Sequence, residues 1–331
     1  RKRINIYPLQ HFFQWGTPQD LEEYNFWSKT FKLIISKENN KSLNLKGSLI
    51  MTMAGNGKRF ISEGYRNPKP FIEVSGYPMV IQALSKLPIC SQNIFVVQEN
   101  ILKSEIFDLI LEKYKNSLIE VISKPTKGQA LTALIGLKKI NPKNHNNPIT
   151  IGSCDSSFFY DNDKYLKLIN NDDVDIIVWA ARNHANSKRN PEMFGWIDAG
   201  KDGFIHQISV KKMIKNDLLK HIVVGTFTFK NISMLEKSIK KMISRKCLIN
   251  GEFYIDSCIN DAISLGYKCY IFEVDYFISW GTPNDLKTFE YWQSAFHKWA
   301  YHPYKVDNDH MINKSKVSNL KNNYKKIDIN F

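Results

Sequence analysis

The sequence predicts an α/β domain in which parallel strands and helices alternate through right-handed crossovers. Strand-like and helix-like segments alternate through residues 48–155, and the apolar runs 49–51 and 149–151 are typical of buried strands. The chain has 331 residues, of which 43% are hydrophobic and 13% aromatic. That is enough material for one large core of ~250 residues. Ligands of such sheets bind beyond the carboxyl ends of the strands, so we expect the functional site in the loops that follow them.

The first strand is followed by a loop with two glycines, Gly55 and Gly57. Glycine allows the backbone to approach a ligand closely, and the N–H groups of such a loop can line phosphates. A Walker loop would have Ser or Thr where Arg59 stands, and a dinucleotide fingerprint would have a third glycine where Phe60 stands. Both motifs therefore fail. Pro68-Lys69-Pro70 adds a second cation between two backbone-restricting prolines, which indicates phosphoryl chemistry.

Four further segments follow in order along the chain. A strand is expected over 93–97 and a helix over 101–113. In the segment 126–134, Gln129 can present both a donor and an acceptor to a base edge, and Gly128 leaves room for a ring. The second apolar strand ends in Asp155, a carboxylate suited to a hard cation such as Mg²⁺.

This set of motifs resembles the sugar-phosphate nucleotidyltransferases, the family of the nucleoside-diphosphate-sugar pyrophosphorylases. The family pattern is a strand, a G-x-G-x-R loop and a Pro-Lys pair, and the resemblance covers roughly residues 46–296. Later matches are the segments 194–212, 225–229, 251–254 and 280–286. The resemblance implies an α/β three-layer nucleotidyltransferase fold, GT-A-like and Rossmann-like, with a mixed, mostly parallel sheet. It also implies transfer of a nucleotidyl group from a nucleoside triphosphate to a sugar 1-phosphate or similar acceptor, with release of pyrophosphate, for surface polysaccharide or glycoconjugate precursors.

The resemblance also assigns roles to residues. Arg59 and Lys69 are the expected catalytic cations, and Asp155 is the expected Mg²⁺ ligand. Lys58 is expected either to help at the β- and γ-phosphates or to point to solvent. The expected nucleotide-binding residues are Ala54, Gly55, Asn56, Gly57, Lys58, Gln98, Gly128 and Gln129. The expected acceptor-binding residues are Gly195, Lys211 (or its neighbour Lys212) and Glu252.

One position departs from the family pattern. Relatives commonly carry a second metal-binding Asp two residues before the glycine of the G-T-P turn, and Ser279 stands there. Metal binding would then rest on Asp155 with triphosphate and water, on another carboxylate such as Asp275, or be absent. The substitution motivates a second hypothesis, a catalytically degenerate nucleotide- or sugar-binding module. A third hypothesis is a GT-A glycosyltransferase, for which Asp161-Asn162-Asp163 has the letters of a D-x-D motif, although we expect a surface turn there.

The chain also contains an internal repeat. Trp15-Gly-Thr-Pro-Gln-Asp-Leu21 recurs as Trp280-Gly-Thr-Pro-Asn-Asp-Leu286, and the likeness extends at the offset 280 − 15 = 265 to aromatic positions on both sides. One domain of this kind is about that long, and no initiator methionine is present. We expect residues 1–36 to be the end of a preceding homologous domain, 37–46 a linker, 47–300 the nucleotidyltransferase domain and 301–331 a basic polar tail. Both segments that follow the G-T-P turns are expected to be helices. The first is expected to dock on this domain or to contact another subunit of a homo-oligomer, and the sequence leaves both open.

Charge and cysteine patterns exclude several other classes. The formal net charge is +14, but lysine is spread along the whole chain and no aromatic-basic module stands out, so nucleic acid is not an expected partner. No apolar run approaches the ~20 residues of a membrane span. The five cysteines show no C-x-x-C spacing, which favours reduced thiols and a cytoplasmic protein. The expected partners are a nucleoside triphosphate and a small phosphorylated acceptor.

Overall fold

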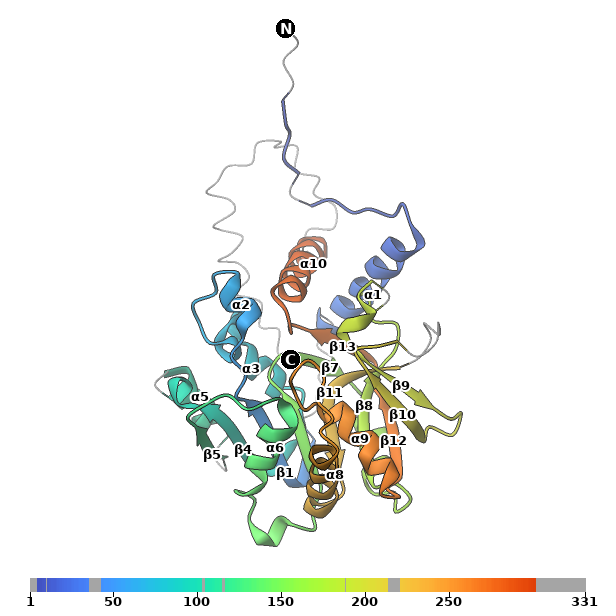
Figure 1. Ribbon diagram of the computed structural model, residues 1–331. Helices are drawn as coiled ribbons and strands as arrows, with labels where there is room; N and C mark the ends of the chain where they lie inside the picture. Colours follow the sequence, from blue (N-terminus) through green and yellow to red (C-terminus); the bar gives the residue numbers. More distant parts are fainter. Residues whose placement is uncertain are drawn as a thin grey trace.

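A computed structural model describes residues 5–9, 11–35, 43–102, 105–114, 117–187, 189–213 and 221–301. A nine-stranded mixed sheet lies at its centre, with helices on both sides (Figure 1). The strand order is β10-β9-β11-β6-β1-β4-β5, with β8 pairing β11 and β12 pairing β8. The strands are β1 (Asn44–Met53), β4 (Ile89–Gln98), β5 (Ser117–Ile122), β6 (Ile149–Ser153), β8 (Ile176–Ala181), β9 (Gly195–Ala199), β10 (Ile205–Val210), β11 (His221–Phe229) and β12 (Cys269–Glu273).

The part of the sheet formed by β6, β1, β4 and β5 is parallel. β1 runs parallel to both β6 and β4, and β4 runs parallel to β5. β11 then pairs antiparallel with β6, β8 and β9. The carboxyl ends of β1 and β6 therefore lie at the same edge of the sheet, and the loops after both strands emerge side by side.

Alternation along β1 explains the three layers. Ile50 points into a core that packs against helices on one face, whereas Leu49 and Met51 point into a second core on the other face. The first face is covered by α6 (Gln129–Leu137), α8 (Ile232–Ser244) and α9 (Ile255–Ser264). The second is covered by α3 (Met79–Leu84), α4 (Glu99–Leu102), α5 (Glu105–Lys113) and α7 (Asn162–Ile169). The predicted α/β three-layer fold is confirmed.

Small elements sit on this frame near the expected site. α2 (Lys58–Ser62) and the 3₁₀ turn η1 (Lys69–Phe71) follow β1. β7 (Ser156–Phe159) pairs antiparallel with β13 (Tyr276–Ser279). The remaining short elements are β2 (Glu73–Val74), β3 (Tyr77–Pro78), η2 (Pro142–Asn144) and η3 (Pro191–Met193).

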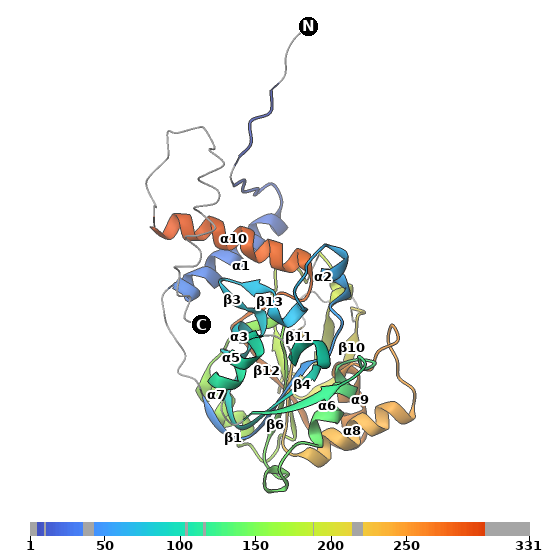
Figure 2. The same cartoon turned by 90° about the vertical axis from the view of Figure 1, so that its left-hand side faces the viewer.

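The two helices that follow the repeated motif pack against each other. α1 (Pro18–Ile35) and α10 (Pro283–Tyr301) share an aromatic cluster, and Figure 2 shows α10 lying across α1 at one end of the molecule. The cluster also takes in residues of α2 and of the β7–β13 pair. The first helix therefore packs on this domain, which is one of the two arrangements expected for it.

Two boundaries differ from those expected. β1 begins at Asn44, inside the segment expected as a linker, because Leu43 and Leu45 pack against the core and Asn44 pairs with Ile89. The segment expected as one helix over 101–113 contains the end of α4 and the whole of α5. Residues 302–331, most of the expected tail, lie outside the described residues. Among the described helices, none is both long and apolar enough to cross a membrane.

Candidate active site

The glycine loop and the Pro-Lys-Pro segment meet in space. Gly57 has a φ of +60° and precedes the first turn of α2, a backbone geometry that glycine adopts without strain. A Cβ atom on Gly57 would lie 3.0 Å from the Cβ of Lys69. Ala54, at the start of the loop, is buried, whereas Gly55, Asn56 and Lys58 are exposed. The absence of a side chain at position 57 therefore lets η1 approach the loop.

Lys69 and Asp155 form an ion pair at this point. The Lys69 Nζ lies 2.5 Å from Asp155 Oδ2 and also donates to the Gly281 carbonyl at 3.3 Å. Ser153 donates its hydroxyl to the other carboxylate oxygen of Asp155. Thr52 of β1 is in register with Ser153 of β6, so Asp155 emerges beside the glycine loop that follows β1. Parallel strand ends are the usual position of ligand sites in α/β sheets.

Each member of the pair stabilises the charged form of the other. Burial alone would lower the pKa of Lys69, but the Asp155 carboxylate outweighs it, and the pKa of Lys69 is raised. Burial would raise the pKa of Asp155, but Lys69 and the Ser153 hydroxyl hold that pKa below its usual range. Both groups are therefore charged at neutral pH.

Gln98 at the end of β4 braces the glycine loop. Its side-chain amide donates to the Ala54 carbonyl at 2.8 Å and to Asn56 Oδ1 at 3.2 Å. β4 is the parallel neighbour of β1, so the amide reaches the loop from the next strand end. Gln98 thus fixes the backbone that is expected to line a triphosphate.

The segment before α6 is bound to the segment before α9. Gly128 has a φ of +105°, and a Cβ there would lie 2.5 Å from the Phe253 carbonyl oxygen. Ala130 N donates to that same carbonyl at 3.1 Å, and Phe253 N donates to the Lys127 carbonyl at 2.8 Å. Gln129 points back over the sheet, donating to Thr52 Oγ1 at 3.3 Å. The expected base segment is therefore coupled to the expected acceptor segment.

The expected acceptor residues form a hydrogen-bonded chain. Lys211 Nζ donates to the Tyr254 hydroxyl at 2.8 Å, and that hydroxyl donates to Glu252 Oε2 at 2.6 Å. Burial, followed by the charge of Arg59, lowers the pKa of Lys211. Burial also raises the pKa of Asp256 to about 6. A side chain at Gly195 would collide with the Asp256 carboxylate, which explains glycine at that position.

Arg59 is exposed on α2, and its charge reaches both halves of the site. It lowers the pKa of Lys211 and opposes the rise in the pKa of Lys69. The pKa of Tyr254 is raised by burial and by Glu252, and Arg59 opposes that rise as well. Arg59 therefore lies near both the Lys69–Asp155 pair and the Lys211–Tyr254 pair. Lys58, its neighbour, is also exposed, and Lys212, beside Lys211, is exposed in the same way.

Asp155 and Ser279 both lie beside the G-T-P turn. A Cβ atom on Gly281 would lie 3.4 Å from Ser279 Oγ and 3.5 Å from Asp155 Oδ2. Trp280 N donates to the Asp155 carbonyl at 2.7 Å, which fixes the G-T-P turn against the carboxylate. Among the described residues, no three His, Cys, Asp or Glu side chains gather as a complete metal site.

Two other carboxylates considered from the sequence lie elsewhere. Asp275 donates its backbone N–H to Phe159, at the opposite end of the β7–β13 pair from Asp155. At about 3.3 Å of rise per residue, that end is about 13 Å away. Asp161 caps α7 by accepting from the N–H groups of Asp163 and Lys164, so the D-x-D letters serve a helix start.

Sequence reasoning missed Tyr254, Asp256, Ser153 and Thr52. Tyr254 stands two residues after Glu252, and in an extended segment that spacing places both side chains on one face. The same spacing joins Ser153 to Asp155. Those two period-2 relations were readable from the sequence, whereas the contacts of Thr52 and Asp256 depend on other strands and helices.

Comparison of the described fold with solved structures finds clear likenesses. A nucleoside-diphosphate-sugar pyrophosphorylase from Vibrio cholerae RC9 superposes with a TM-score of 0.57 at 17% identity, over 73% of this chain and 98% of the other. An inositol-1-phosphate CTP transferase from T. maritima superposes with a TM-score of 0.58 at 18% identity, over 75% and 96%. No family model and no curated protein sequence matches the chain. At these identities the likeness shows a shared fold.

Proposed function

We propose that the protein is a nucleotidyltransferase that moves a nucleoside monophosphate from a nucleoside triphosphate to a sugar 1-phosphate or similar small phosphorylated acceptor. The observation that carries the proposal is the convergence of the glycine loop, Lys69 and Asp155 at the adjacent ends of β1 and β6. Two proteins of the same fold are a nucleoside-diphosphate-sugar pyrophosphorylase and an inositol-1-phosphate CTP transferase, which supports the same class here. The Asp161 helix cap removes the motif that would favour a glycosyltransferase.

The reaction joins two anions, so charge repulsion is its main obstacle. An acceptor phosphate oxygen attacks the α-phosphorus and forms a new P–O bond. The bond from the α-phosphorus to the bridging oxygen breaks, and its electron pair leaves with pyrophosphate. Positioning and cationic stabilisation supply most of the catalysis in such transfers. The guanidinium of Arg59 suits the leaving pyrophosphate, because its planar fork can bind two oxygens at once.

Lys69 suits the α-phosphate or the incoming acceptor phosphate. Its Nζ is held by Asp155 and the Gly281 carbonyl, and its backbone lies between two prolines. A compact ammonium fixed in this way is pre-organised to meet negative charge that develops during transfer. The N–H groups of the loop that Gln98 braces would line the remaining phosphate oxygens.

Mg²⁺ fits this site through one carboxylate. Asp155 would hold the ion. The Ser279 hydroxyl, which stands where relatives commonly carry a second metal-binding Asp, would offer a neutral oxygen beside it. Mg²⁺ is commonly bound by one or two carboxylates together with substrate phosphates and waters, so a lone Asp155 is sufficient in kind. When bound, the ion would neutralise triphosphate charge. Because Lys69 already compensates Asp155, the chain keeps this carboxylate ionised and ready at neutral pH.

The acceptor would bind on the Lys211 side of Arg59. Lys211 offers an ammonium to a phosphate, and Glu252 accepts from hydroxyl groups. Tyr254 joins the two and sets their separation. We extend the proposal to a cytoplasmic enzyme that supplies activated precursors for surface polysaccharide or glycoconjugate synthesis. The named sugar and inositol substrates of the structural relatives and the five free cysteines support it.

The first test needs no guess about the acceptor. Thermal unfolding is followed with Mg²⁺ and, in turn, ATP, CTP, GTP, UTP and dTTP. A ligand at ~100 times its Kd adds ~2.7 kcal/mol and raises the midpoint visibly. The stabilising nucleotide is then assayed for pyrophosphate release with a panel of sugar 1-phosphates. Stabilisation without release for any acceptor would favour the degenerate binding module, and no stabilisation by any nucleotide would contradict the proposal.

A further inference from the structure

The two copies of the repeated motif adopt the same capped helix start. In the first, Thr17 N and Thr17 Oγ1 contact Asp20 Oδ2 at 3.1 and 2.8 Å, and Asp20 N donates back at 3.2 Å. In the second, Thr282 and Asp285 make the same three contacts at 3.1, 2.7 and 3.1 Å. Such reciprocal capping fixes the first turn of a helix. α1 and α10 are therefore equivalent in local structure as well as in sequence.

The packing between the two helices is reciprocal. Phe31 and Phe296 occupy equivalent positions, since 31 + 265 = 296, and their rings stack at 5.7 Å. Tyr24 lies 5.7 Å from Phe296, and the equivalent exchange, Phe31 with Phe289, lies at 5.5 Å. Each contact therefore recurs with the roles of the helices exchanged.

A second exchanged pair confirms the pattern. Tyr24 contacts Trp292 at 6.0 Å, and Trp27 contacts Phe289 at 6.1 Å, where Tyr24 corresponds to Phe289 and Trp27 to Trp292. Residue i contacting j while j contacts i is the mark of a twofold, isologous interface. Here it arises between two segments of one chain.

The faces of the two copies differ sharply in exposure. In the second copy the domain covers the apolar side chains that precede and start the helix: Phe277 is 5% exposed, Trp280 0% and Leu286 1%. The equivalent side chains of the first copy are open: Phe12 is 66% exposed, Trp15 56% and Leu21 48%. Contiguous apolar side chains left in the open mark an interaction surface. What covers the second copy is the body of its own domain, chiefly the β7–β13 pair and α2.

We propose that the α1 segment, residues 12–35, is the closing element of a second domain of this same fold. The body of that domain covers Phe12, Trp15 and Leu21. The two domains are then joined through α1 and α10 with approximate twofold symmetry. The partner is a domain homologous to residues 43–276, so the surface is specific for that fold and is not a general apolar patch.

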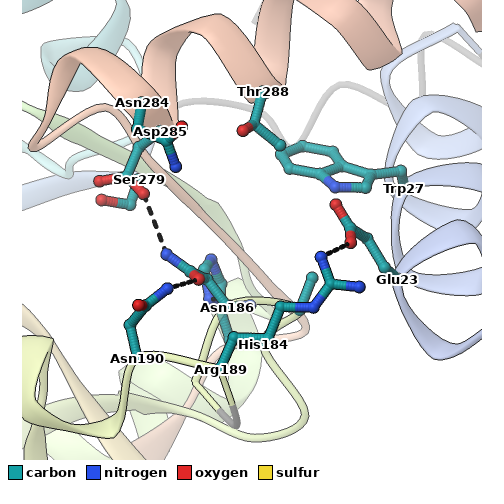
Figure 3. Close-up of a pocket in the computed structure, with 11 residues that line it drawn as sticks. Glu23, Trp27, His184, Asn186, Arg189, Asn190, Ser279, Asn284, Asp285 and Thr288 are labelled. Carbon is teal, nitrogen blue, oxygen red and sulfur yellow. Dashed lines mark hydrogen bonds and ion pairs between the residues drawn. The ribbon is translucent and has the colours of Figure 1, made fainter. Parts of the chain in front are cut away.

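Polar contacts hold α1 in its place on the present domain. Arg189 pairs with Asp20 at 3.0 Å and Glu23 at 2.5 Å, while Asn186 donates to Asp285, the equivalent of Asp20, at 3.2 Å. A cavity of about 140 Å³ lies between α1, α10 and the segment 184–190. Figure 3 shows Glu23, Asn186, Arg189 and Asp285 among the side chains that line it. Side chains of the segment 184–190 therefore contact both helix caps, as expected where two equivalent elements meet.

The test repeats the domain body ahead of the open motif. In a duplicated chain, residues 43–276 are placed directly before Phe12, so that α1 takes the place that α10 holds in the original copy. We expect both copies to resist trypsin equally and Trp15 to lose its access to iodide quenching. The matched control carries W15S/L21E, which removes the covered apolar contacts and should leave the added copy open to digestion. Digestion of the added copy in both chains, with the original copy intact, overturns the proposal.

A second measurement uses the chain without any duplication. F31A and F296A should each lower the midpoint of thermal unfolding, and the double variant should lower it by less than the sum of the two, because the two rings contact each other. K29A with F296A is the control and should give additive shifts, because Lys29 is exposed. Additive shifts for F31A and F296A would refute the direct α1–α10 packing. Neither experiment depends on catalysis, so the outcome is separate from the test of the proposed function.

Discussion

Lys69 Nζ and Asp155 Oδ2 lie 2.5 Å apart, although 86 residues of sequence separate the two side chains. The pair joins the Pro-Lys-Pro turn to the end of β6, at the edge of the sheet where the glycine loop also emerges. Both side chains are about one-fifth exposed, at 19% and 23%. A pair with that degree of burial is coupled more strongly than a surface ion pair, and each partner depends on the other for its charge.

Loss of both partners should destabilise the fold less than the sum of the two single losses. K69M and D155N each leave a partly buried charge without its partner, so the double variant should recover about 1–3 kcal/mol relative to the sum of the single variants. Urea unfolding of the three variants measures this coupling free energy. The control cycle uses Lys287 and Glu63, an exposed ion pair, for which the coupling should stay under about 1 kcal/mol. Equal coupling in both cycles would show that the Lys69–Asp155 pair is held no more strongly than a surface pair.

Arg59→Ala should abolish most of the activity and leave the fold intact. Arg59 is exposed, so its loss removes no core contact, but the proposed grip on pyrophosphate is lost. We expect less than about 1% of the wild-type rate of pyrophosphate release, which corresponds to roughly 3 kcal/mol of transition-state stabilisation. Arg66→Ala, at another exposed arginine in the segment between α2 and η1, is the control and should keep its rate. Near-normal release by the Arg59 variant would remove Arg59 from the site.

Gly128→Ala should weaken nucleotide binding and stability together. A Cβ at this position meets the Phe253 carbonyl at 2.5 Å, so either the base segment or the acceptor segment must move. Gly251→Ala provides a control for a positive φ, because its φ is +79° and no atom lies within 4 Å of the added Cβ. Thermal unfolding should place the Gly128 variant about 1–3 kcal/mol below the Gly251 variant, because Gly128 has both the Phe253 contact and a more restricted backbone conformation, with φ +105° and ψ 168°. Equal losses would mean that neither feature costs more than an ordinary positive φ.

Asp256→Asn should stabilise the protein at high pH and have little effect at low pH. The pKa of Asp256 is raised from 3.8 to about 6, so the folded state binds its proton more tightly than the unfolded state. That contribution is present in full below about pH 4, fades as pH rises through 6 and is lost above it. The variant should therefore exceed the wild type by up to about 3 kcal/mol at pH 8, from a pKa difference of about two units. Unfolding in urea at pH 4.5, 6 and 8 gives the difference, and a gap that does not grow with pH contradicts the assignment.

Motif order along the chain predicted much of the site. Gly55 and Gly57 marked the loop, the family resemblance gave the expected roles of Arg59, Lys69 and Asp155, and the apolar runs placed the loops after strands. Parallel neighbours share an edge, so residues that follow β1 and β6 were expected to meet. The structure brings Lys69 and Asp155 together there, while their proposed roles in nucleotide transfer await the assays above.

The sequence by itself determined the fold class, the loop that starts the site and the existence of the repeat, because these depend on local pattern and on spacing along one chain. Only the tertiary structure decided that Asp275 stands apart from Asp155, that Tyr254 links Lys211 to Glu252, and that α1 lies on α10. Each of these is a contact between side chains on different elements, chosen by packing and by which charges lose their water. Such a choice depends on the whole core at once, and the local pattern that specifies each element does not contain it.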